Sequence, residues 1–324
     1  MWPLLFWMQK HLVWSIPLAM IAGFVAGQII EPDPLRWAIL PLTFLMVYPM
    51  MVTMNLRQLL QPGGGKLLWV TQLLNFILIP AIGYGAGLLF FPDEPFARLA
   101  LLLTSLLPTS GMTISWTGFA KGNVPAAVRM TVVGLIAGSL LAPFYLKGLL
   151  GAVIEIPVSQ VFMQIALIVF LPLALGYFTQ RALISKHGAS TFHQEVKPKF
   201  PPFSTLGVLG VVFVSMALKS QDILNNPGSL FAYLVPLLLI YALNFVISTL
   251  IGKALFPRGD AIALVYGTVM RNLSIALAIA MGVFGEEGAD AALLIALAYI
   301  VQVQAAAWYV RFSDRLFGAP ESLT

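Results

Sequence analysis

Apolar runs long enough to cross a bilayer recur along the whole chain, and short polar or Gly/Pro-rich stretches separate them. A transmembrane helix needs about 20 mostly apolar residues, so each run predicts one membrane-spanning helix. We count ten runs, near 11–30, 37–55, 67–91, 97–119, 125–149, 160–181, 203–218, 229–255, 261–284 and 289–310. The pattern therefore predicts an all-α polytopic membrane protein with ten transmembrane helices.

The composition agrees with this fold class. Hydrophobic residues make up 59% of the chain and charged residues only 10%, far below the average of about 25% in soluble domains. The first ten residues lack a small-residue cleavage site, so the first apolar run is expected to be a retained helix rather than a signal peptide.

The distribution of charge predicts an orientation. Ten spans place both termini on one side, which carries 12 of the 18 Lys and Arg residues, against 4 on the other side and 2 inside spans. The positive-inside rule then places both termini in the cytoplasm. The expected location of the protein is the plasma membrane or a bacterial inner membrane. The net charge of +5 is spread over loops, so no nucleic-acid partner is expected.

The spacing of the breaks predicts an internal repeat. Five helices in each half would invert the second half relative to the first. Thr109 lies 42 residues after the start of span three at Leu67, and Arg271 lies 42 residues after the start of span eight at Ser229. Paired interrupted helices in inverted repeats are typical of secondary transporters. We therefore expect two inverted five-helix repeats, with the first repeat and helix six in 1–181, a cytoplasmic loop in 182–202, and helices seven to ten in 203–324.

Arg271 is the strongest candidate for a functional residue. It lies near the middle of the run 261–284, where a charge costs about 2.5–3.5 kcal/mol on insertion scales. No acidic residue falls in the interior of any predicted span, so backbone carbonyls, polar side chains, water or an anionic ligand must satisfy the guanidinium. The neighbouring Asn272 adds a donor and an acceptor.

A second break is predicted in span four. Pro108 removes a backbone donor and kinks a helix, and hydroxyl residues follow it at Thr109, Ser110 and Thr113. Irregular backbone at this depth is tolerated where it is buried or lines a cavity. The sequence predicts helix breaks at three positions, Pro108, Gly111 and Met270.

Enzyme chemistry is not expected. The chain has no cysteine, its three histidines lie in loops or at a helix end, and none of its 13 acidic residues lies in a span interior. These absences leave no nucleophile–base pair and no transition-metal site at bilayer depth, and no cofactor is predicted. The lone amides of the spans are expected to form interhelical hydrogen bonds: Asn75, Asn244, Gln302 and Gln304.

The run Ala120-Lys121-Gly122-Asn123-Val124, which follows the break at Pro108 and precedes Met130-Thr131, resembles the bile acid/sodium symporter superfamily. The run from Val47 to Met51, and Pro108 followed by Met112 and Trp116, are most similar to its arsenical-resistance (arsenite efflux) branch. This resemblance implies a core domain from spans 67–149 and 229–310 and a panel domain from spans 11–55 and 160–218. It also implies that interrupted helices four and nine cross.

Several positions depart from the family pattern. The residues that coordinate Na⁺ in sodium-coupled members correspond here to Thr113, Ile114, Ala127, Thr131, Gly267 and Arg271. The cysteine and the glutamate of the arsenite carriers correspond to Thr109 and Asn272. Because Na⁺ requires several oxygen ligands, we infer that Arg271 replaces the bound cation with a fixed one.

The expected function is a secondary transporter or facilitator of a small anionic or polar solute, working by alternating access without Na⁺ coupling through the usual family sites. Its substrate-binding residues would be Arg271, Asn272, Thr109, Ser110 and Thr113. One alternative is an arsenite/antimonite efflux carrier, and a second is a non-transporting membrane sensor or assembly subunit. The sequence does not determine the substrate, the direction of transport, the coupling ion or the oligomeric state.

Overall fold

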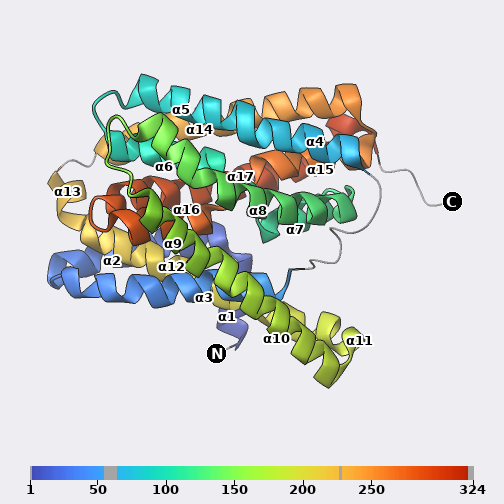
Figure 1. The fold of residues 1–324 in the computed structure, drawn as a ribbon, viewed down its shortest axis with the longest axis horizontal. Coiled ribbons are helices and arrows are strands. Elements are labelled where there is room, and N and C mark those ends of the chain that lie inside the picture. Colours follow the sequence, from blue (N-terminus) through green and yellow to red (C-terminus); the bar gives the residue numbers. More distant parts are fainter. Residues whose placement is uncertain (1, 55–63, 226–227, 320–324) are drawn as a thin grey trace.

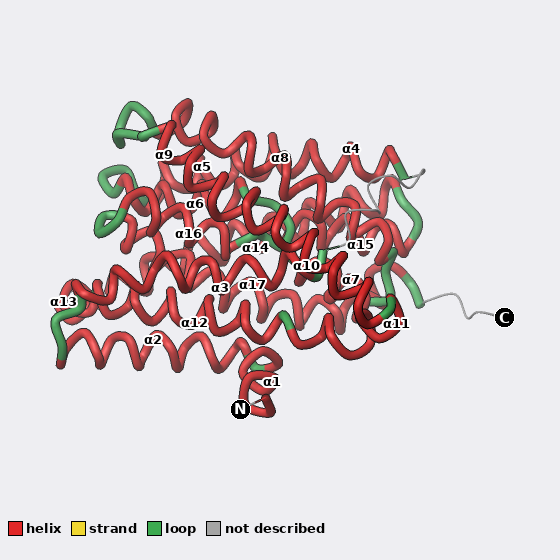
Figure 2. Tube along the Cα trace, turned by 60° about the horizontal axis from the view of Figure 1, so that its bottom comes forward, coloured by secondary structure: helices red, strands yellow, loops and turns green. Residues whose placement is uncertain are grey.

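The computed structural model describes residues 2–54, 64–225 and 228–319. The described chain is helical, and no strand occurs in these three ranges (Figure 2). Two parts of the sequence predictions lie outside the described residues. They are residue 55, at the end of the second predicted span, and residues 320–324, at the end of the predicted segment 203–324.

The helices of the first half, with the π-helical turn η3 and the 3-10 helix η1, are α1 Trp2–Lys10, α2 Leu12–Ile29, η1 Asp33–Ala38, α3 Ile39–Val52, α4 Gly65–Leu73, η3 Leu74–Leu78, α5 Ile79–Phe90, α6 Pro95–Leu106, α7 Gly111–Phe119 and α8 Val124–Leu150. Those of the second half, with the π-helical turns η4 and η5 and the 3-10 turn η6, are α9 Val158–Ile165, η4 Ala166–Phe170, α10 Leu171–His187, α11 Ala189–Thr191, η5 Phe192–Val196, η6 Lys197–Lys199, α12 Pro201–Leu218, α13 Ser220–Asn225, α14 Gly228–Leu255, α15 Arg258–Val269, α16 Leu273–Phe284 and α17 Gly288–Phe317.

Seven helical stretches in the described ranges are long and apolar enough to cross a membrane. An eighth is possible if α1 and α2, which meet at a bend of 101°, form one span. The seven are Asp33–Val52, Gly65–Phe90, Val124–Leu150, Val158–His187, Ala189–Leu218, Leu230–Leu255 and Gly288–Phe317. The chain is therefore an integral, polytopic membrane protein. The other two predicted spans, 97–119 and 261–284, are each divided into two short helices.

The segment 182–202 was expected to be a loop, and the structure corrects this. Helix α10 continues to His187, a single residue, Gly188, ends it with φ +82°, and helical turns then lead through η5 and η6 into α12. Figure 1 shows α10 extending beyond the neighbouring helices, with α11 at its far end. Phe192 is fully buried within this mostly polar segment, and its side chain anchors these turns against the protein.

Helix α12 packs against α2 and α3, and α10 also packs against α3. Glycines allow the close approach: a Cβ on Gly23 or Gly27 would lie 2.3 Å from the carbonyl oxygen of Phe213 or Ala217. A larger side chain at either glycine would therefore push α2 and α12 apart.

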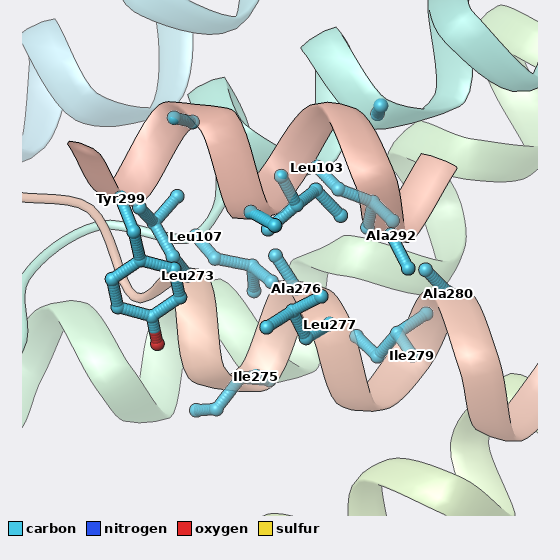
Figure 3. Packing of buried hydrophobic residues seen from close by; sticks show 14 of the residues in the cluster. Leu103, Leu107, Leu273, Ile275, Ala276, Leu277, Ile279, Ala280, Ala292 and Tyr299 are labelled. Carbon is cyan, nitrogen blue, oxygen red and sulfur yellow. The ribbon is translucent and has the colours of Figure 1, made fainter. Parts of the chain in front are cut away.

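The remaining long helices form a second set of contacts, in which α17 packs against α6, α14 and α16. Figure 3 shows Ala276, Leu277 and Ala280 of α16 among apolar side chains that include Leu103 of α6 and Ala292 of α17. Between membrane-spanning helices such contacts stabilise the fold through close van der Waals packing, because lipid tails are as apolar as these side chains. This packing fixes the position at which α16 begins, and with it the segment that carries Arg271.

Candidate functional site

The first helix break lies at Leu107–Ser110, between α6 and α7. A proline disfavours the helical conformation of the residue before it, and Leu107 is accordingly extended, with φ −89° and ψ 92°. Thr109 adopts φ +61°, which is uncommon for a β-branched residue. Its hydroxyl donates to the carbonyl oxygens of Pro108 at 2.7 Å and Thr131 at 3.2 Å, which stabilises this strained turn.

Helix α7 then begins with a capping box. The Ser110 hydroxyl accepts a hydrogen bond from the amide of Met112 at 3.2 Å, and the Thr113 hydroxyl accepts one from the amide of Ser110 at 3.2 Å. Capping satisfies amides that have no partner within the helix. Both hydroxyls therefore have a local structural role.

The second break lies at Met270–Asn272, between α15 and α16, and contains no proline. Met270 is extended, and Asn272 is the N-cap of α16, where its side-chain oxygen accepts a hydrogen bond from the amide of Ile275 at 3.2 Å. The side chain of Gln302 in α17 stabilises the opened backbone. Its oxygen accepts from the Arg271 amide at 2.7 Å, and its nitrogen donates to the Arg271 carbonyl at 3.3 Å.

The two breaks meet. Pro108 and Arg271 form an antiparallel bridge, in which the Thr109 amide donates to the Met270 carbonyl and the Asn272 amide donates to the Leu107 carbonyl, each at 2.8 Å. A buried backbone group without a hydrogen bond is costly, particularly in lipid. Each break therefore supplies partners to the other, and the crossing is held by backbone pairing.

Arg271 lies at this crossing with only 2% of its surface exposed. Both terminal nitrogens of its guanidinium donate to the side-chain oxygen of Asn75, each at 3.0 Å. Its Nε has no hydrogen-bond partner among the described residues. The positive charge is therefore held in place by a neutral amide.

Asn75 lies in the π-helical turn η3. Its side-chain nitrogen donates to the carbonyl of Gly267 in α15 at 3.0 Å. The Asn75 side chain therefore bonds both to the backbone of α15 and to the guanidinium of Arg271. Pro80 lacks an amide hydrogen and leaves the Phe76 carbonyl without its helical donor; the Tyr145 hydroxyl of α8 donates to that carbonyl instead. π-helical turns are frequent at functional sites.

A cavity of about 540 Å³ lies beside the crossing. Arg271 and Ser110 line it, together with the first residues of α7 and α16, and much of its remaining surface is apolar. The lining residues are Gln9, Leu12, Met46, Met50, Thr53, Ser110, Gly111, Met112, Ile114, Ser115, His193, Lys197, Pro198, Pro201, Ser204, Thr205, Val208, Arg271, Leu273, Ser274 and Tyr299. This volume lies within the usual range of small-molecule sites, about 300–1,000 Å³.

The structure brings all five predicted binding residues to the crossing but only two of them to the cavity. Arg271 and Ser110 line it. Thr109, Thr113 and Asn272 are buried and hold the turns and caps that shape it. The predicted breaks at Pro108 and Met270 fall in the non-helical segments, and Gly111 is the first residue of α7.

Sequence reasoning missed several residues of the site. Ser274 and Tyr299 line the cavity, and their hydroxyls lie 2.6 Å apart; Figure 3 shows the Tyr299 oxygen pointing out of the apolar cluster. Asn75 and Gln302 do form the interhelical hydrogen bonds predicted for lone amides, but nothing in the sequence indicated Arg271 as their partner. Gln304 is exposed on α17.

The electrostatic character of the cavity follows from its lining. Arg271, Lys197 and His193 are present, and no aspartate or glutamate occurs among the described lining residues. Helices α7 and α16 direct their N-termini toward the crossing. Unpaired amides and the helix dipole make a helix N-terminus favourable for anions. The arrangement is suited to holding negative charge.

The run Ala120–Val124 forms the turn between α7 and α8. Asn123 caps α8, its amide donates to the Gly259 carbonyl at 2.9 Å, and its side chain donates to Asp260 at 2.6 Å. A Cβ on Gly122 would lie 2.6 Å from Ile262, so only glycine fits there. The motif therefore joins the far end of α7 to the start of α15.

Known proteins similar to this chain are membrane transporters and resistance proteins. The arsenical-resistance protein Acr3 of Alkaliphilus metalliredigens is 24% identical, over 95% of this chain and 92% of its own length. Acr3 of Corynebacterium glutamicum is 22% identical, over 76% of this chain and 70% of its own. An uncharacterized transporter of Synechocystis sp. is 22% identical, over 91% of this chain and 85% of its own.

The sequence profile of the Sodium Bile acid symporter family matches residues 40–226, more than half of the chain. This stretch contains the first break, the Lys121-Gly122-Asn123 turn and Lys197. The chain is a membrane transporter and belongs to the Sodium Bile acid symporter family.

Proposed function

We propose that this protein is a secondary transporter or facilitator that binds a small anionic or polar solute beside Arg271 and carries it by alternating access. The observation that carries the proposal is the buried guanidinium of Arg271 at the crossing, held by the neutral Asn75 with its Nε unpaired among the described residues. An arginine at bilayer depth is costly, and a bound anion would offset that cost.

The order of the helices supports an inverted repeat. In the first half a long helical stretch (α4 to α5) is followed by the broken pair α6/α7 and then by the long helix α8. In the second half α14 is followed by the broken pair α15/α16 and then by α17. We infer that each broken pair is one span, which completes ten, and that both termini are cytoplasmic in a plasma or bacterial inner membrane.

The helix contacts support the division into two domains. The mutual packing of α2, α3, α10 and α12 corresponds to the panel domain, and that of α5, α6, α8 and α14–α17 to the core domain. Residues of both groups line the cavity, because Met46 and Ser204 belong to the panel helices and Arg271 belongs to the core. Movement of the core against the panel would expose the cavity to each side of the membrane in turn.

Na⁺ coupling through the usual family positions does not fit the residues present. The Thr113 hydroxyl is engaged in the capping box, and the Thr131 hydroxyl donates to the Ala127 carbonyl at 2.8 Å. Gly267 has no side chain, and the guanidinium of Arg271 would repel a cation. We therefore include no Na⁺ step in the transport cycle.

The test is uptake of small anions into proteoliposomes, combined with the shift in Tm that each anion causes in the purified protein. A ligand that binds only the folded state raises the apparent stability. Arg271→Gln should abolish both signals. Arg98→Gln should leave both unchanged, because Arg98 donates to the Phe91 carbonyl and lies outside the cavity lining. Wild-type anion flux in Arg271→Gln would refute the proposal.

A second candidate, arsenite or antimonite efflux, is favoured by the similarity to two Acr3 proteins along most of the chain. Thr109, at the position where the branch has its cysteine, points its hydroxyl at two carbonyls. A neutral metalloid acid would therefore bind to hydroxyls of the cavity nearest the crossing, which include Ser110, Ser274 and Tyr299. Metalloid resistance in a host without its own efflux system, retained by Arg271→Gln, would select this function over anion transport.

A further inference from the structure

Lys197 lies in the segment between the predicted spans six and seven, in the 3-10 turn η6 just before α12. It lines the main cavity, and it also lines a smaller cavity of about 110 Å³ that shares Met50, Thr53, Gly111 and Ile114 with the first. Its side chain is half-buried and forms no ion pair within the described residues. Its neighbour Lys199, in the same turn, is exposed and does not line either cavity.

Two residues with cationic side chains, from different parts of the fold, therefore line the cavity. Arg271 comes from the crossing of the broken helices, and Lys197 comes from the turn that leads into α12. No carboxylate balances them among the described lining residues of either cavity. Like charges in a cavity that is partly shielded from bulk water repel each other more strongly than they would in water, so the two cations give the cavity a net positive field.

On the basis of the proposed function, we propose that Lys197 is a second anion-binding residue of this cavity and that the transporter selects dianions over monoanions. A dianion balances both charges at once, whereas a monoanion leaves one of them uncompensated. Charge-assisted hydrogen bonds are roughly twice as strong as neutral ones. The chemical class is a solute with two negative charges, carried either at two ends, as in a dicarboxylate, or on one compact oxyanion.

Dianion binding has a mechanical consequence for the transport cycle. Arg271 is held by core contacts through Asn75 and Gln302, whereas Lys197 leads directly into the panel helix α12. A solute that contacts both side chains links the two groups of helices. Its binding energy then favours the state in which core and panel close around it, since a ligand shifts a conformational equilibrium only through its different affinities for the two states.

The experiment compares matched anions on the purified full-length protein. The pairs are succinate with butyrate, which tests two-ended dianions, and sulfate with nitrate, which tests compact ones. Apparent Kd is measured from the dependence of Tm on ligand concentration at constant ionic strength. The variants are Lys197→Gln, Lys197→Arg, Lys199→Gln as the matched control, and Arg271→Gln.

In the wild-type protein at least one dianion should bind more tightly than its matched monoanion. Lys197→Gln should weaken dianion binding by about tenfold or more while monoanion binding changes little. Lys197→Arg and Lys199→Gln should both keep the preference for the dianion. Which of the two pairs shows the preference identifies the geometry of the solute.

Two results would overturn the inference. One is a wild-type protein that prefers no dianion in either pair, and the other is a Lys197→Gln variant that keeps the full preference. These failures are distinguishable from failure of the proposed function. If Arg271→Gln abolishes anion binding while Lys197→Gln has no effect, the anion site remains and only the role of Lys197 is refuted. If Arg271→Gln binds anions as the wild type does, the proposed function itself is refuted.

Discussion

At the scale of single residues, the site depends on how one charge is held. Arg271 has no acidic partner among the described residues; its guanidinium donates to Asn75, and Gln302 bonds its backbone amide and carbonyl. A neutral partner positions the guanidinium without cancelling its charge. A carboxylate in the same place would form a buried ion pair, which is strongly coupled and would leave less positive potential for a ligand.

Replacing Asn75 by aspartate tests this reasoning. Asn75→Asp should weaken anion binding by about tenfold or more, because the new carboxylate neutralises the guanidinium in advance. Ligand-induced shifts in Tm measure the effect, and the Tm of the unliganded protein reports on folding. Asn244→Asp is the control, since Asn244 is also a buried amide but forms no hydrogen bond with Arg271 among the described residues. Equal anion affinity in Asn75→Asp and wild type would contradict this role of the amide.

At the scale of elements, the two breaks arise differently. The first follows from Pro108, which removes a donor and disfavours helix at Leu107. The second has no proline and is stabilised from outside, by Gln302 of α17 and by pairing with the first break. Helix α8 completes the support, because its glycines allow the first break to approach closely. A Cβ on Gly134 would lie 2.8 Å from the Thr109 hydroxyl, and one on Gly138 would lie 2.8 Å from Pro108 Cδ.

Alanine at Gly138 should therefore displace the first break. We expect Gly138→Ala to destabilise the protein by about 1–3 kcal/mol, the usual cost of overpacking, and to weaken anion binding. Gly148→Ala on the same helix is the matched control, because a Cβ there meets nothing within 4 Å; alanine in a helix interior is favoured over glycine by about 0.5–1 kcal/mol. Unfolding midpoints in denaturant compare the two variants. Identical behaviour of both would show that the close contact does not constrain the break.

At the scale of the whole molecule, the cavity lies toward one end of the helices. Its lining includes Gln9 of α1, Thr53 at the end of α3 and Pro201 at the start of α12, which belong to the side predicted to be cytoplasmic. At the other end of α12, Lys219 forms an ion pair with Asp290 of α17 at 2.9 Å. We interpret this conformation as open toward the termini and closed at the opposite side.

The natural absence of cysteine allows this orientation to be tested with single labels. Ser204→Cys, in the cavity lining, should react with a membrane-impermeant maleimide only from the side of the termini, and a bound anion should slow the reaction. Ser185→Cys, exposed on α10, should react from the same side at a rate that ligand does not change. Labelling of Ser204→Cys from the opposite side alone, or without ligand protection, would contradict the interpretation.

The sequence by itself determined the features that follow from local physics. Long apolar runs predict membrane helices because burial in lipid requires them, Pro108 predicts a break because it lacks a donor, and Arg271 marks a site because an intramembrane charge is costly. The helical nature of 182–202 was missed, since the polar composition of that segment resembles a loop and few of its residues, among them Phe192, are buried.

Only the tertiary structure decided which side chains share the site. Asn75 and Arg271 are 196 residues apart, and their pairing depends on which faces of η3 and the second break meet. The orientation of Thr109 is one such outcome: its backbone at φ +61° directs the hydroxyl to the carbonyls of Pro108 and Thr131. Lys197 joins the cavity because helical turns position it there. These outcomes depend on long-range packing, because neither the apolar pattern nor local propensity specifies which helix faces come into contact.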